Sequence, residues 1–295
     1  MITAKQVKEL RDLTGAGMLD CKKALEETNG DIEQAVIYLR EKGIAKAAKK
    51  GARIAAEGLT NGIVEGNKAV LYEVNSETDF VSKNEQFLNL IDTVGTVLFN
   101  NTVNSDEEAL KLESNGESLE TVLANATATI GEKITLRRVK TIIKEDNQTF
   151  GFYKHMGGKI SALALVEGDE EVAKNIAMHV AAQNPKYLTQ DEIEQSVIEQ
   201  ERSILLNQAL EENKTAEKPK PDNIIEKMVE GRLNKELKEV CLVNQAYVKD
   251  PNISVSEYLK QNKASVKLFV RLEVGEGIEK RKEDFAAEVQ AQIKG

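Results

Sequence analysis

The chain has 295 residues, of which 41% are hydrophobic and 30% charged, and its 40 basic and 49 acidic residues give a net charge of −9. This composition predicts a globular protein of two or more folding units. It argues against a protein that mainly coats nucleic acid, because phosphate neutralisation supplies most of such affinity. No apolar run approaches the roughly 20 residues that span a bilayer, and residues 1–6 lack the apolar segment of a signal peptide, so we expect a cytoplasmic protein.

Three short helices are predicted within the first 43 residues. Thr3 and Gln6 form a capping-box pattern at the start of the first helix, and residues 14–17, Thr-Gly-Ala-Gly, end it. Asp31 is placed to cap the third helix, which we expect to end at Gly43. Three helices in so short a span are typical of a small bundle of the ubiquitin-associated (UBA) type.

An Ala-rich basic stretch follows at residues 44–57 and contains Lys46, Lys49, Lys50 and Arg53. We interpret it as a helical or flexible connector. A small nucleic-acid-binding strip is the alternative, although the acidic balance of the whole chain opposes it.

From residue 58 onward, strand and helix patterns occur in separate groups. The predicted strands are residues 59–64, 69–74, 134–143, 151–155, 160–167 and 265–274. The predicted helices are residues 82–99, 105–113, 116–130 and 169–183. Residues 65–67, Glu-Gly-Asn, are expected to form a hairpin turn. Residues 70–74 resemble residues 162–166, and a helix is predicted after each, so we expect two related halves of α+β class with antiparallel sheets.

A helical hairpin is predicted between about residues 187 and 240. Apolar residues recur there at helical spacing in a charged background, and the sequence Lys-Pro-Lys-Pro at 218–221 must interrupt the helix. Two amphipathic helices joined in this way form an antiparallel, coiled-coil hairpin. A final amphipathic helix is predicted at residues 283–293.

These elements predict six segments. They are a UBA-like three-helix domain with its linker at 1–52, a first core subdomain at 53–139, the first part of a second core subdomain at 140–186, a coiled-coil hairpin at 187–228, the second part of that core subdomain at 229–275, and a C-terminal module at 276–295.

No catalytic constellation stands out in the sequence. The phosphate-binding pattern G-x-x-x-x-G-K-[ST] is missing, and neither His155 nor His179 has a neighbouring arrangement typical of a nucleophilic triad. Cys21 and Cys241 lie far apart, without companions at zinc-ligand spacing. We therefore expect no catalytic residues, no cofactor and no metal. His179 lies in an apolar helix and is expected in or beside the core, and His155 is expected to be exposed.

Residues 75–85, Asn-Ser-Glu-Thr-Asp-Phe-Val-Ser-Lys-Asn-Glu, form the motif most suggestive of function. A capping box of Ser82 with Glu85 would place Asp79 and Phe80 at a strand–helix junction. In one interpretation Asp79 satisfies free backbone N–H groups and Phe80 packs into the protein's own core. In the other, the two residues project as an acidic-aromatic wedge that binds a pocket on a partner. Periodicity does not separate the two interpretations.

Several segments, in order along almost the whole chain, resemble signatures of the elongation factor Ts family. Residues 10–25, LRDLTGAGMLDCKKAL, resemble its N-terminal signature, and residues 74–81, with Thr-Asp-Phe, resemble its core signature. Further matches are residues 176–182, 226–232 and 273–279. A lone Thr-Asp-Phe is a weak signal, whereas this combination is highly specific.

The resemblance implies a guanine-nucleotide exchange factor in translation elongation that promotes GDP release from elongation factor Tu and is not an enzyme. It implies that Phe80 inserts between helices of the nucleotide-binding domain of Tu, with Asp79 beside it and Thr78 and Val81 on either side. That insertion would disturb the Mg²⁺ site and the loops that hold the phosphates.

The resemblance also implies further partner-binding positions. Those expected to grip another helix of the same Tu domain are Arg11, Met18, Leu19 and Lys22. Those expected to face the third domain of Tu are Ile130, Gly131 and His155. Leu19 stands where some members have Met, a volume-conserving change. The hairpin at 187–228 resembles a protrusion linked in some members to dimerisation, so a homodimer is a further expectation.

Three alternatives remain open. A UBA-like adaptor without exchange activity would need only residues 1–43 for binding its partner. A ribosome- or RNA-binding protein using residues 46–53 would show steeply salt-dependent affinity. An enzyme of another kind is the third alternative. We expect neither a membrane nor a direct nucleic-acid partner.

Overall fold

The computed structural model describes residues 2–103, 105–215 and 218–279. The chain divides into two compact units. The first contains the residues up to Ile143, Lys154–Ser161 and the described residues from Leu272 onward, and the second contains Lys144–Tyr153 and Ala162–Arg271. Helices and antiparallel strands occur in separate groups, which confirms the predicted α+β class. Within the described residues, no helix combines the length and the apolar character needed to cross a bilayer.

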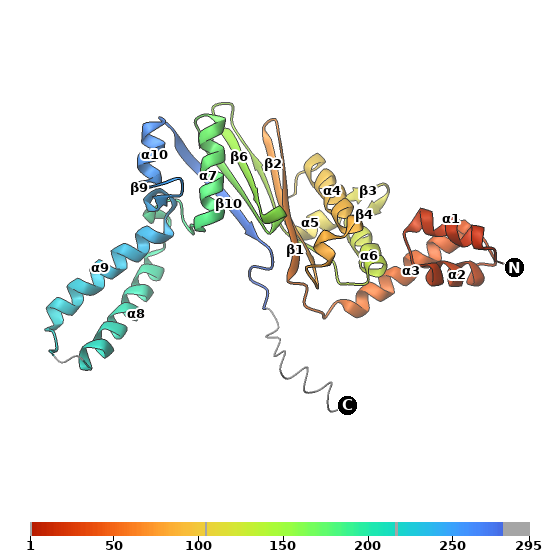
Figure 1. Cartoon of the computed structure of the whole chain (residues 1–295), viewed down its shortest axis with the longest axis horizontal. Coiled ribbons are helices and arrows are strands. Elements are labelled where there is room, and N and C mark those ends of the chain that lie inside the picture. Colours follow the sequence, from red (N-terminus) through yellow and green to blue (C-terminus); the bar gives the residue numbers. More distant parts are fainter. Residues whose placement is uncertain (1, 104, 216–217, 280–295) are drawn as a thin grey trace. The chain divides into compact units, whose positions relative to one another are not determined.

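The first unit begins with three packed helices (Figure 1). They are α1 (Ala4–Thr14), α2 (Met18–Glu27) and α3 (Ile32–Lys50). Thr3 and Gln6 form the predicted reciprocal capping box, and Asp31 accepts a hydrogen bond of 3.0 Å from the Gln34 N–H at the start of α3. The small core of this bundle consists of Val7, Leu10, Cys21, Ala24, Leu25 and Ala35.

The prediction that the third helix ends at Gly43 is wrong, because α3 continues to Lys50. Helix α6 (Leu119–Ile130) packs against this part of α3. A Cβ at position 43 would lie 3.1 Å from Asn125 Oδ1 and 3.4 Å from Ala128 Cβ. Gly43 therefore permits the close approach of two helices, and their packing outweighs its helix propensity, which is about 1 kcal/mol poorer than that of Ala.

A three-stranded antiparallel sheet forms the centre of the first unit, in the order β1-β2-β5. Its strands are β1 (Glu57–Glu65), β2 (Lys68–Ser76) and β5 (Thr135–Ile143). Helices α4 (Glu85–Asn100) and α5 (Asp106–Leu110) pack against it, and α6 packs against these two helices. The pairing of Glu65 with Lys68 confirms the predicted hairpin turn. A short pair, β3 (Glu113–Ser114) and β4 (Glu117–Ser118), was not predicted.

Gly95 lies where α4 crosses Tyr72 of the sheet. Tyr72 is fully buried and donates a 2.9 Å hydrogen bond to the Ile91 carbonyl. A Cβ at position 95 would lie 2.2 Å from Tyr72 Oη. We expect Gly95→Ala to lower the free energy of unfolding by about 1–3 kcal/mol, because overpacking outweighs the better helix propensity of Ala. Urea unfolding measures the effect.

Gly231 is the matched control for this substitution. It lies in helix α9 (Asp222–Val240) of the second unit, and a Cβ there would meet no atom within 4 Å. Gly231→Ala should raise stability by up to about 1 kcal/mol. A Gly95→Ala protein as stable as the wild type would contradict the packing described for Tyr72.

A second sheet has the strand order β10-β7-β6. Its strands are β6 (Thr149–His155), β7 (Ile160–Glu167) and β10 (Ser265–Glu273). Like β2, β7 is the central strand of three, is almost entirely buried, and is followed by a helix, here α7 (Glu170–Gln183). The two segments of similar sequence thus occupy equivalent positions in their sheets. Two strands and one α-helix of the second unit were also not predicted: β8 (Ala246–Tyr247), β9 (Asp250–Ser254) and α10 (Val255–Gln261).

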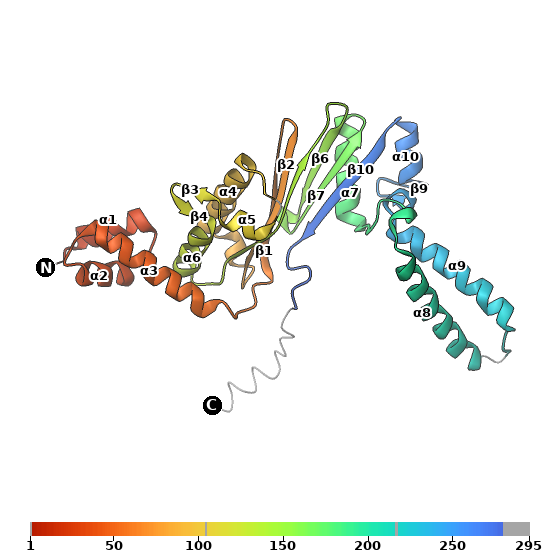
Figure 2. The ribbon, with the colours of Figure 1, turned by 180° about the vertical axis from the view of Figure 1, so that it is seen from behind.

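The predicted pair of helices is present as α8 (Gln195–Lys214) and α9, which lie side by side in Figures 1 and 2. The buried seam between them is formed by Leu205, Ala209, Ile225, Val229 and Leu233. Arg202 Nε lies 2.6 Å from Glu230 Oε1 across the seam. Helix α9 continues to Val240. The helix predicted at 283–293 lies outside the described residues.

His179 of α7 is fully buried, as predicted for a core imidazole. Its Nδ1 accepts a hydrogen bond from the Val248 N–H at 3.2 Å, so Nε2 carries the proton and donates to Gln245 Oε1 at 2.9 Å. Gln245 Nε2 in turn donates to the carbonyl of Glu239, near the end of α9, at 2.8 Å. This neutral imidazole thus helps to attach the helical hairpin to α7.

Burial lowers the pKa of His179 below its ordinary value. An unfolded His has a pKa of about 6.5. The folded state therefore loses stability as the pH falls from about 6.5 through the folded-state pKa, by at most about 1.4 kcal/mol per pH unit. We expect the stability advantage of wild type over His179→Gln to shrink as the pH is lowered, and urea unfolding at several pH values measures it. An advantage that does not change with pH would contradict the neutral imidazole.

Candidate functional site

The Asp79–Phe80 loop, residues 77–80, connects β2 to a 3₁₀ turn, η1 (Val81–Lys83). The predicted capping box of Ser82 with Glu85 is wrong. Because η1 forms a separate turn, α4 starts later, and Asn84 caps it by accepting a 2.8 Å hydrogen bond from the Gln86 N–H. Ser82 instead donates to the Asp79 carbonyl at 2.6 Å, which fixes the end of the loop.

Phe80 projects into solvent with 81% of its surface exposed. The interpretation in which it packs into the protein's own core is therefore wrong. Asp79 beside it is exposed as well. Val81 is only 8% exposed and belongs to the core beneath the loop, so it anchors the chain directly after Phe80. A buried Val next to an exposed Phe keeps the aromatic ring on the surface.

The start of the Asp79–Phe80 loop is held by the segment that follows α6. The Glu132 carboxylate accepts from the Thr78 N–H at 2.9 Å and from the Thr78 hydroxyl at 2.7 Å. Glu77 accepts from the Lys133 N–H at 2.6 Å and pairs with Arg53 at 3.3 Å. The loop is thus ordered by contacts on both sides of the exposed pair.

The N-terminal bundle presents a second exposed group of predicted residues. Leu19 is 85% exposed in the first turn of α2, and Met18 beside it is also exposed. Arg11 and Lys22 lie on the surface of the same bundle. Leu13 near the end of α1 is exposed too.

The remaining predicted positions lie at the ends of α6 and β6. Ile130 packs partly against the core, and Gly131 ends α6 with φ 91°, a conformation that favours glycine. Gly131 directly precedes Glu132, so the structure brings it close to the Asp79–Phe80 loop. His155 is half-buried at the end of β6, rather than exposed as expected.

The solvent exposure of Met156, directly after His155, was not predicted from the sequence. It is 71% exposed and has φ 47°, in a turn that continues through two glycines with positive φ. The turn is held by Thr60, whose hydroxyl donates to the Gly158 carbonyl at 2.8 Å. Nothing in the spacing of apolar residues indicates that this Met faces solvent.

The comparisons with known proteins decide the family. A model of the family described as Elongation factor TS matches residues 77–276. The chain is 56% identical over 294 residues to Elongation factor Ts of Acholeplasma laidlawii (strain PG-8A), with 99% of each chain covered. The chain belongs to the elongation factor Ts family. It is also 52% identical over 294 residues, at the same coverage, to Elongation factor Ts of Spiroplasma citri. The family match begins at the Asp79–Phe80 loop, and the relatives extend the similarity over the bundle.

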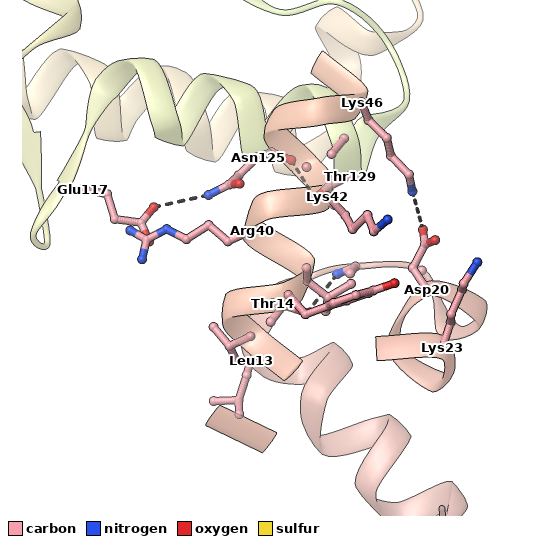
Figure 3. A pocket seen from close by; sticks show the side chains of 17 residues that line it. Leu13, Thr14, Asp20, Lys23, Arg40, Lys42, Lys46, Glu117, Asn125 and Thr129 are labelled. Atoms are coloured by element: carbon pink, nitrogen blue, oxygen red, sulfur yellow. Dashed lines mark hydrogen bonds and ion pairs between the residues drawn. The ribbon is translucent and has the colours of Figure 1, made fainter. Parts of the chain in front are cut away.

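In this member of the elongation factor Ts family, the basic stretch at 44–57 is largely engaged within the protein. Lys46 pairs with Asp20 at 3.0 Å, beside a cavity of about 420 Å³ between the bundle and α6 (Figure 3). Lys50 donates to the Gly131 carbonyl, and Arg53 pairs with Glu77. These contacts favour the connector interpretation over a nucleic-acid-binding strip. Among the residues that the structure describes, no group of His, Cys, Asp or Glu is arranged to hold a metal ion.

Proposed function

We propose that this chain is a guanine-nucleotide exchange factor that binds elongation factor Tu and promotes GDP release without chemistry of its own. Membership of the elongation factor Ts family supports this role. The observation that carries the mechanism is the 81% exposure of Phe80 on a loop whose backbone is hydrogen-bonded on both sides. An aromatic side chain in water on an ordered loop is suited to enter a pocket on a partner.

In the proposed mechanism, Phe80 enters between helices of the nucleotide-binding domain of Tu, with Asp79 beside it. Thr78 and Val81 act mainly by fixing the loop, since one is hydrogen-bonded to Glu132 and the other is buried. The inserted ring shifts the elements that hold Mg²⁺ and the phosphates. Burial of one Phe contributes about 1.5–3 kcal/mol to such a complex.

One inserted Phe does not suffice for exchange. Inverting a strongly biased nucleotide equilibrium requires about 5 kcal/mol of differential binding. Further contacts are therefore needed, and we assign them to two groups. The group that contacts another helix of the same Tu domain is Arg11, Met18, Leu19 and Lys22. The group that faces the third domain of Tu is Ile130, Gly131 and His155.

The finer architecture is part of this proposal. We infer that α1–α3 form a UBA-like domain and that α8 and α9 form a coiled-coil protrusion. The small apolar core of the bundle and the apolar seam of the hairpin support these assignments. The partly exposed Val197, Ile204 and Ile224 of the hairpin support a contact with a second copy of the chain.

The test of the proposed function is release of a fluorescent GDP analogue from elongation factor Tu of the same organism. Catalytic amounts of this chain should accelerate release strongly in the presence of excess unlabelled GDP. A folded sample that gives no acceleration would contradict the exchange function. Binding of Tu by residues 1–43 alone, as tightly as by the full chain, would favour the adaptor alternative.

A further inference from the structure

The orientation of the Phe80 side chain depends on residues 77–79, a segment that lacks the regular backbone hydrogen bonds of a helix or a strand. Residues 77–80 belong to neither a strand nor a helix, and the Phe80 side chain has little packing of its own. A mobile loop would lose entropy on binding, and this loss would reduce the binding energy available to shift the partner. Whatever orders residues 77–79 therefore determines how effective Phe80 is.

Glu132 is the residue that holds this segment most directly. Its two carboxylate oxygens accept from the two donors of Thr78, the backbone N–H at 2.9 Å and the hydroxyl at 2.7 Å. Hydrogen bonds to an ionised carboxylate are stronger than those between neutral groups. Two such bonds fix the orientation of Thr78 as well as its distance from Glu132. Thr78 lies only two residues before Phe80.

The segment that contains Glu132 is itself held by contacts with α6. It follows Gly131, which ends α6, and the Ile134 N–H donates to the Thr127 hydroxyl of α6 at 3.0 Å. The adjacent Lys133 N–H donates to Glu77 at 2.6 Å. Glu77 and Thr78 are therefore joined to Lys133 and Glu132, respectively. Lys133 Nζ also donates to the carbonyl of Arg53, in the linker after α3, at 2.9 Å.

We propose that Glu132 is a positioning residue for nucleotide exchange, which fixes the Thr78 backbone so that Phe80 is presented in one orientation. Glu132 acts through Phe80 and need not touch the partner. This inference rests on the proposed exchange function. It assigns a role in presenting Phe80 to a residue that lies 54 positions from Thr78 in the sequence.

The experiment compares Glu132→Gln with wild type in the full chain. Gln keeps the size of the side chain but has a single acceptor oxygen and no charge, so it cannot accept from both Thr78 donors and its remaining hydrogen bond is weaker. Amide hydrogen exchange at Thr78 should become about tenfold faster, and accelerated GDP release should become about tenfold slower. Glu120→Gln, which changes an exposed carboxylate in the first turn of α6, is the matched control and should leave both readouts unchanged.

A double-mutant cycle distinguishes an effect of Glu132 that passes through Phe80 from a general loss of structure. In a Phe80→Ala background, Glu132→Gln should slow release less than twofold further, because its effect passes through Phe80. Equal slowing in both backgrounds, or wild-type release by Glu132→Gln, would overturn the proposal. If the wild type itself fails to accelerate release, the exchange function fails instead. Unchanged Thr78 amide exchange in Glu132→Gln would overturn the positioning role independently of any activity.

Discussion

Replacing Phe80 by Ala is expected to slow GDP release from elongation factor Tu by about 10- to 100-fold, because burial of one Phe contributes about 1.5–3 kcal/mol. The bundle and the surface at Gly131 and His155 are unaffected by this change, so binding of Tu should weaken but remain measurable. Stopped-flow release of a fluorescent GDP analogue measures the rate, and titration calorimetry measures the binding.

The fold should not change, since Phe80 is 81% exposed and surface substitutions usually alter stability by less than about 0.5 kcal/mol. Leu88→Ala is the matched control, because Leu88 is an exposed apolar residue of α4 outside the Asp79–Phe80 loop. It should leave exchange unchanged. A folded Phe80→Ala protein with wild-type exchange would refute the role assigned to the ring.

Replacing Glu73 by Ala should give the largest loss of stability. Glu73 of β2 is fully buried, and its carboxylate contacts Arg137 at 3.2 Å and Arg138 at 2.6 Å. It also accepts from the Asn75 amide and from the Gly275 N–H, each at 2.7 Å. Removing one partner of a buried ion pair costs about 3–5 kcal/mol. The two arginines left side by side would repel each other.

Thermal unfolding tests this expectation. A loss of that size should lower the Tm by about 10 °C. Glu276→Gln is the control, because Glu276 pairs with the same Arg138 at 2.8 Å but is 44% exposed, and exposed pairs contribute at most about 1 kcal/mol. Equal Tm values for Glu73→Ala and the wild type would show that the arginines are satisfied without the buried carboxylate.

Local signals predicted much of the fold. The capping residues Thr3 and Gln6 marked the start of α1, and the turn sequence at residues 65–67 predicted the β1–β2 hairpin. Non-local packing could not be predicted. The continuation of α3 past Gly43 depends on α6, which lies more than 70 residues later in the chain. Strand β8 has only two residues, and β9 begins with Asp, Pro and Asn, which are uncommon in strands.

In the candidate site, too, the local pattern was recognised from the sequence and the non-local contacts were not. The motif at residues 75–85 was found from sequence, but whether Phe80 faced the core or solvent was open. The answer depends on Val81 reaching the core and on Glu132 holding Thr78 from a distant segment. The exposure of Met156 likewise depends on a turn fixed by Thr60 of β1. Neither arrangement leaves a pattern in the sequence near the residue concerned.

The central claim is that this chain distinguishes between nucleotide-free and GDP-bound elongation factor Tu. The most direct test measures its affinity for both forms, the GDP-bound form in the presence of Mg²⁺. We predict tighter binding to the nucleotide-free form by a factor on the order of 10⁴, and an equal weakening of GDP binding by Tu when this chain is present. Equal affinity for the two forms would contradict the account, since a protein that binds both states equally shifts no equilibrium.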